Sequence, residues 1–147
     1  MGHSIIAIDG NGFQTKDHWL ELWLRMLALH LQPLLPRAWD EATERELRLH
    51  ELRDIWLLYT DQPQNGCVMA AEERIVEHDD VRCAVLEAAR LVLEKLRASG
   101  PVIDRARLDL AIRDHGWLRD PPTEPVIRVG EAFVRLLEGE ADGFEHV

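Results

Sequence analysis

Residues 17–32, DHWLELWLRMLALHLQ, decide the fold of this chain. Asp17 is a suitable N-cap for a helix, and Pro33 and Pro36 follow the stretch and stop the helix from continuing. The few polar residues keep to one narrow stripe, while leucines and tryptophans cover the rest of the surface. A helix that is apolar on most sides has to be surrounded by protein. We therefore predict a central helix here, around which the other elements pack.

The segment before this helix has the pattern of a β-hairpin. Residues 4–8 are short, β-branched and apolar, and the sequence Asp-Gly-Asn-Gly follows at residues 9–12. Asp-Gly and Asn-Gly favour the positive φ angles of a tight hairpin turn. We predict a small N-terminal hairpin that closes near Thr15.

Downstream of the central helix, apolar residues recur at the three-and-four spacing of a helix with one buried face. The period is unclear only between Cys67 and His78, where strand and helix remain alternatives and helix is preferred. The predicted helices cover residues 40–59, 67–78, 79–99, 104–115 and 126–137.

Together these segments predict an all-α fold, an irregular bundle of about five helices with the short hairpin laid against one end. No internal repeat, low-complexity tract or shift in composition divides the chain, so we expect one helical domain over residues 1–147. We expect the acidic, glycine-containing end, residues 138–147, to be frayed.

The charge of the chain limits its partners. Its 147 residues include 27 acidic and 17 basic side chains, which gives a formal net charge of -10. A negative surface repels the phosphate backbone of nucleic acids and attracts basic surfaces. We therefore expect no nucleic-acid binding, and we expect a basic protein as the partner; the oligomeric state is open.

The cysteine content and the hydropathy favour a cytoplasmic protein. Only Cys67 and Cys83 are present, without the Cys-x-x-Cys spacing of a zinc site, and the N-terminus lacks the pattern of a secretory signal. The most apolar stretch, residues 19–35, is interrupted by charged residues and proline, so we expect no membrane span.

No P-loop, Gly-x-Ser-x-Gly or His-Glu-x-x-His motif is present, so the sequence favours a non-catalytic function. The acids concentrate in one segment, and two tryptophans next to predicted helix ends, if exposed, could anchor a partner. A charged surface that only keeps the protein soluble is the alternative interpretation. The predicted partner-binding residues are Glu72, Glu73, Glu77, Asp79, Asp80, Trp39 and Trp117. Small acidic immunity and inhibitor proteins, which this chain resembles in size and charge, bind basic partners in this way.

One pattern favours an enzyme instead. Glu51-x-x-Asp54 and Glu77-x-x-Asp80 each place two carboxylates on neighbouring positions of a helix, and oxygen ligands of this kind hold Mg²⁺. The two pairs are similar to the carboxylate pairs of all-α nucleoside triphosphate pyrophosphatases of the MazG type. The resemblance implies a metal-dependent hydrolase, with these four residues as magnesium ligands. Without it, we expect no cofactor and no metal.

Overall fold

The computed structural model describes residues 2–61, 68–108 and 119–147, and the described chain is mainly helical, as predicted. The helices are α1 (Asp17–Leu31), α2 (Glu44–Asp61), α3 (Glu72–Val76), α4 (Asp79–Ala98) and α5 (Thr123–Glu138). Three short 3₁₀ turns accompany them, η1 (Gln32–Leu34), η2 (Trp39–Glu41) and η3 (Arg105–Leu108). The strands are β1 (His3–Ile8), β2 (Asn11–Lys16) and β3 (Phe144–His146).

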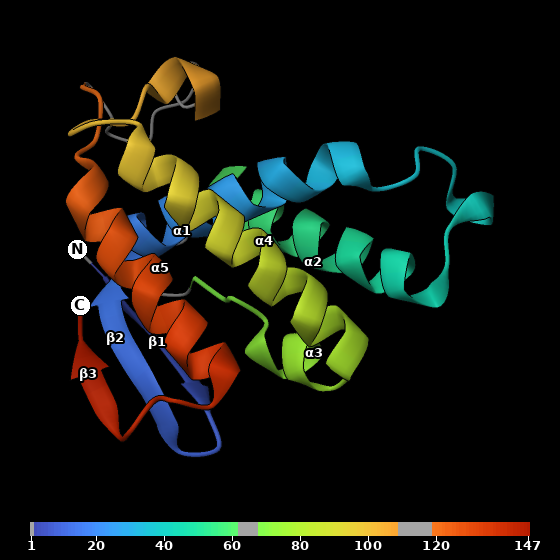
Figure 1. Cartoon of the computed structure of the whole chain (residues 1–147), viewed down its shortest axis with the longest axis horizontal. Coiled ribbons are helices and arrows are strands. Elements are labelled where there is room, and N and C mark those ends of the chain that lie inside the picture. Colours follow the sequence, from blue (N-terminus) through green and yellow to red (C-terminus); the bar gives the residue numbers. More distant parts are fainter. Residues whose placement is uncertain (1, 62–67, 109–118) are drawn as a thin grey trace.

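Helix α1 is the centre of the molecule, which confirms the prediction from its sequence. It packs against α2, α4, α5 and the hairpin, and Figure 1 shows the other long helices gathered around it. Leu20, Leu24 and Leu27 have no exposed surface. Arg25, one of the few polar residues of this helix, is only 5% exposed.

The N-terminal hairpin forms as predicted. The turn residues Asp9 and Gly10 have φ angles of 50° and 82°, and Ile8 pairs with Asn11 in the antiparallel register. Two positive φ angles in a two-residue loop match the right-handed twist of the strands. The hairpin also contributes to the core, because Ile6 and Phe13 are paired and buried.

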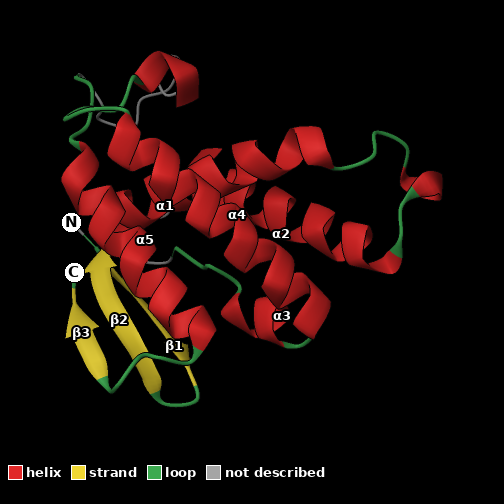
Figure 2. Cartoon of the chain, in the orientation of Figure 1, coloured by secondary structure: helices red, strands yellow, loops and turns green. Residues whose placement is uncertain are grey.

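The sheet has a third strand that the sequence did not predict. β3 pairs with β2 in parallel, so that the end of the chain lies on the hairpin (Figure 2). The Gly12 amide donates to the Gly143 carbonyl at 3.0 Å, and the Val147 amide donates to the Gln14 carbonyl at 3.0 Å. Within residues 138–147, where we expected a frayed end, the structure has the strand β3, which is hydrogen bonded to β2.

Some predicted helix boundaries are corrected by the structure. α2 begins at Glu44 rather than Asp40 because Thr43 and Glu46 form a capping box, in which each side chain accepts the other residue's backbone N–H. α4 agrees with its prediction within a residue.

Two further predicted helices, over 67–78 and 104–115, agree with the structure only in part. Only residues 72–76 of the predicted helix over 67–78 are helical, and Cys67 lies outside the described residues. Of the helix predicted over 104–115, the structure describes only the start, as η3. Within the described part of the chain, no helix has the combined length and hydrophobicity that crossing a membrane requires.

Candidate functional site

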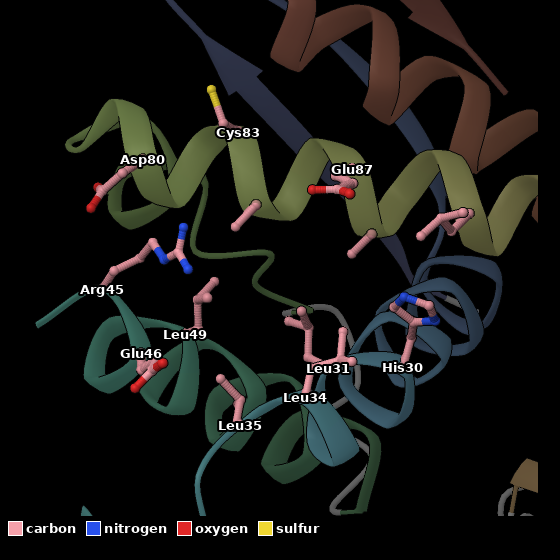
Figure 3. A pocket seen from close by; sticks show the side chains of 13 residues that line it. His30, Leu31, Leu34, Leu35, Arg45, Glu46, Leu49, Asp80, Cys83 and Glu87 are labelled. Atoms are coloured by element: carbon pink, nitrogen blue, oxygen red, sulfur yellow. The ribbon is translucent and has the colours of Figure 1, made fainter. Parts of the chain in front are cut away.

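A groove of about 500 Å³ lies between α4 on one side and the end of α1, η1 and the start of α2 on the other (Figure 3). The residues that line it are His30, Leu31, Leu34, Leu35, Arg45, Glu46, Leu49, Asp80, Cys83, Ala84, Glu87, Ala88 and Leu91. We refer to this site as the groove.

The groove has an apolar floor and apolar edges. Leu31, Leu35 and Leu49 are buried at its base, where they belong to the main core. Leu34 on η1 and Leu91 on α4 are 67% and 41% exposed. These two leucines expose apolar surface on two sides of one cavity. The free energy falls when another apolar group covers such a surface.

Carboxylates surround this apolar surface. Asp80 and Glu87 are two turns apart on α4, and Glu46 comes from the first turn of α2. Arg45 is the single Lys or Arg among the lining residues, and its side chain extends from α2 towards α4 (Figure 3). Among the described residues, neither Asp80 nor Glu87 nor Arg45 belongs to an ion pair. The acidic side chains of the groove are therefore not neutralised within the described fold.

His30 adds no positive charge to the groove near pH 7. Partial burial lowers the pKa of His30, and the nearby Lys95 ammonium lowers it further. Lys95 Nζ donates a hydrogen bond to His30 Nδ1 at 3.3 Å. An ammonium group can only donate, so Nδ1 is the unprotonated nitrogen and the proton is on Nε2.

The acidic segment, residues 72–80, lies on α3 and the start of α4, next to the groove. Glu73, Asp79 and Asp80 are exposed, whereas Glu72 is half-buried. Glu77 is also exposed and lies 3.9 Å from His78 Nε2. Asp80 belongs to both the acidic segment and the groove, so the two adjoin at this residue.

Trp39 is the predicted aromatic anchor that the structure describes. It is 53% exposed on η2, and its ring stacks on the buried His50 ring with centroids 4.9 Å apart. His50 Nε2–H donates to the Pro36 carbonyl at 3.0 Å and so holds the loop before η2 against α2. Trp39 lines a second cavity, which shares Leu35 with the groove. Trp117 lies outside the described residues.

The four carboxylates of the hydrolase interpretation are distributed over different surroundings. Glu51 and Glu77 share a small cavity with two arginines, and Arg74 Nη1 lies 3.0 Å from Glu51 Oε2. Asp54 is held by Arg53 at 2.6 Å, and Asp80 lines the groove. No three His, Cys, Asp or Glu residues within 2–61, 68–108 and 119–147 are grouped as metal ligands. Glu51 therefore already has a cationic partner, Arg74.

Sequence reasoning missed most of the groove. Leu91 has the spacing of a core residue, yet it lies at the edge of the buried face of α4. The available signal was a second stripe on α4, in which Asp80, Ala84, Glu87 and Leu91 follow one another at three-and-four spacing. Which helix faces this stripe cannot be read from the pattern.

The groove and the acidic segment define a surface that can bind another macromolecule by charge and by apolar contact. Comparison with known proteins found no match to a protein-family model, a curated protein or a solved structure.

Proposed function

We propose that this protein is a non-catalytic binding domain that recognises a basic partner protein through the acidic segment and the groove. The observation that carries the proposal is the combination of open apolar surface with carboxylates that have no cationic partner in the described fold. Acids in such a position are available to pair with the cationic side chains of another molecule.

The two parts of the surface have different roles in this proposal. Exposed carboxylates attract a positively charged partner over a distance of about 10 Å and increase the rate of encounter, but they contribute little affinity. Affinity comes from apolar groups that lose contact with water at the centre of an interface. The acidic segment therefore steers the partner, and the groove together with Trp39 supplies the buried contacts. Trp117 remains a predicted second anchor.

We place this function in the cytoplasm. Cys83 is a free and exposed thiol, which is stable against oxidation only in a reducing compartment. Small acidic immunity and inhibitor proteins block basic toxin enzymes by the kind of recognition proposed here.

Affinity purification with the immobilised protein at low and high salt tests the proposal. The wild type is compared with the triple variant Glu73→Gln, Asp79→Asn and Asp80→Asn, which removes three negative charges from the surface. We expect the wild type to recover one basic protein at low salt and to lose it as the ionic strength rises, because salt screens exposed charges. The variant should recover little of it.

A matched control removes the same charge elsewhere. Glu124→Gln, Glu140→Gln and Asp142→Asn neutralise three exposed acids on α5 and the segment that follows it. This control should bind the partner as the wild type does. Equal recovery by both triple variants, or no basic protein recovered by the wild type, would contradict the proposed function.

A further inference from the structure

The groove has the size and the lining of a site for apolar side chains. A cavity of about 500 Å³ is within the range of roughly 300 to 1,000 Å³ found for ligand sites. Two of the residues that line it, Ala84 and Ala88 on α4, have small side chains. Small residues on one wall allow another backbone to approach closely, as in the contacts between packed helices.

The carboxylates restrict what can enter. Asp80 and Glu87 are seven residues apart, which corresponds to two helical turns, or about 10 Å along α4. Glu46 adds a third carboxylate from the opposite wall. A segment with basic side chains at a similar two-turn spacing, on both sides of an apolar stripe, is complementary to this arrangement. An acidic or purely apolar segment is not, because it would leave the carboxylates unpaired or repelled.

The walls of the groove favour a helix over an extended segment as the conformation of the bound segment. They consist of α1, η1, α2 and α4, and none of the strands β1, β2 and β3 contributes a residue. An extended segment would find no strand edge here with which to pair its backbone N–H and C=O groups. A helix satisfies these groups internally and presents side chains at the three-and-four spacing that the groove accepts.

We propose that the groove binds one amphipathic helix of the partner, whose leucine-like side chains lie between Leu34 and Leu91 and whose lysines or arginines pair with Glu46, Asp80 and Glu87. This inference rests on the proposed function and specifies the part of the partner that is recognised. The inference also predicts that Arg45 weakens the binding of a basic helix, because its positive charge repels the lysines and arginines of that helix.

Fluorescence anisotropy with labelled synthetic peptides tests the inference on the full chain. The probe is a 15-residue peptide of leucine and lysine, with the leucines at three-and-four spacing. Two further peptides serve for comparison, one with serine in place of every leucine and one with glutamate in place of every lysine. We expect the leucine–lysine peptide to bind at least about tenfold more tightly than either of the others.

Variants of the protein locate the binding site. Leu91→Ser and Glu87→Lys should each weaken binding of the leucine–lysine peptide about tenfold, since each removes one kind of contact. Leu58→Ser and Glu94→Lys are the matched controls, because both residues are exposed and neither lines the groove. Both controls should bind as the wild type does.

A gain-of-affinity variant does not depend on whether the other changes disturb folding. Arg45→Ala removes the positive charge from the groove and should strengthen binding of the leucine–lysine peptide about threefold, because like charges repel. A decrease in affinity would show that Arg45 contributes a favourable contact, and it would overturn the role assigned here.

The outcomes separate this inference from the proposed function. Suppose the serine-containing peptide binds as tightly as the leucine-containing one, or Leu91→Ser changes nothing. The helix inference is then wrong, while salt-dependent capture of a basic protein can still support the proposed function. If no peptide binds, the inference is likewise wrong. If the purification recovers no basic protein either, both proposals fail.

Discussion

Glu21, on α1, makes the stability of the protein depend on pH. Burial and, to a smaller extent, the Asp17 carboxylate one turn earlier together raise the pKa of Glu21 to about 7. Between about pH 4.5 and pH 7 the folded protein therefore holds a proton that the unfolded chain has released. Because the folded state binds more protons, the free energy of unfolding falls as the pH rises through this interval.

Glu21→Gln should remove this contribution. We expect the free energy of unfolding of the variant to exceed that of the wild type by an amount that grows from pH 5 to pH 8, up to at most about 3 kcal/mol. Urea unfolding curves at pH 5, 6, 7 and 8 measure it. Glu94→Gln, at an exposed position on α4, is the control and should follow the wild type throughout. A constant difference between Glu21→Gln and wild type at all four pH values would contradict the prediction.

Arg25 is a second residue of α1 that we expect to affect the stability of the protein, and more strongly than most arginines do. It donates from Nε to the Leu108 carbonyl on η3 and from Nη1 to Asp61 Oδ1 at 2.8 Å, at the end of α2. The Arg25 side chain is only 6% exposed, and its removal breaks both of these charge-assisted hydrogen bonds. Arg25→Ala should therefore lower the free energy of unfolding by about 3 kcal/mol in urea titrations at pH 7.

The comparison for Arg25 is a surface arginine in a similar pair. Arg48 lies 3.8 Å from Glu44 one turn earlier on α2, and both side chains are more accessible to water. Exposed pairs of this type contribute roughly 0 to 1 kcal/mol, so Arg48→Ala should change stability little. Equal effects of the two substitutions would mean that burial of Arg25 does not increase the cost of its removal.

Among the elements, the packing of α5 depends on a single glycine. Gly130 lies in the middle of α5, where a Cβ atom would come within 2.6 Å of the Trp23 ring on α1 and 2.7 Å of Leu93 on α4. Glycine is here required by close packing, although it costs about 1 kcal/mol in a helix relative to alanine. Gly130→Ala should lower the free energy of unfolding by about 1 to 3 kcal/mol because overpacking exceeds the gain in helix propensity.

Thermal or urea unfolding of Gly130→Ala measures this balance. Arg128→Ala, on the exposed side of the same helix, controls for the effect of alanine on α5 alone and should leave stability within about 0.5 kcal/mol of the wild type. If Gly130→Ala stabilised the protein, the close approach of α5 to Trp23 would not persist in solution.

At the scale of the whole molecule, the sheet joins the two ends of the chain, because β1 and β3 both pair with β2. Beyond the strand pairing, the Gly143 amide donates to Asn11 Oδ1 at 2.9 Å, and Arg135 Nη2 donates to Glu145 Oε1 at 2.6 Å. Deletion of residues 141–147 should therefore lower the free energy of unfolding by about 3 kcal/mol, since several hydrogen bonds worth about 1 kcal/mol each are lost.

The variant Glu145→Gln distinguishes the contribution of the β3 pairing to stability from that of the ion pair between Arg135 and Glu145. The variant keeps β3 but weakens the contact to Arg135, so we expect it to lower stability by less than about 1 kcal/mol. A frayed end, as the sequence analysis expected, would make the deletion neutral in the same urea titration.

Features that depend on short-range chemistry were predictable from the residues alone. The central position of α1 followed from its apolar surface, and the hairpin followed from Asp9 and Gly10, which accept positive φ angles. The bounds of α4 followed from its regular spacing and from the Ser-Gly-Pro sequence after it. The start of α2 was missed by four residues because the acids at 40 and 41 suggested a first turn, although the capping box at Thr43 was readable.

Features that join distant segments depend on how the whole chain packs and were not predictable from the residues alone. The pairing of β3 with β2 connects residues about 130 positions apart, and no local pattern in three residues specifies a partner. The groove likewise combines residues from three helices, and its acids belong to helix surfaces that look like ordinary solvated faces in the sequence. Local propensity fixes where a helix begins and what it buries. How far apart two helices lie depends on the packing of all the other elements. The groove depends on the distance between α4 and the elements opposite it.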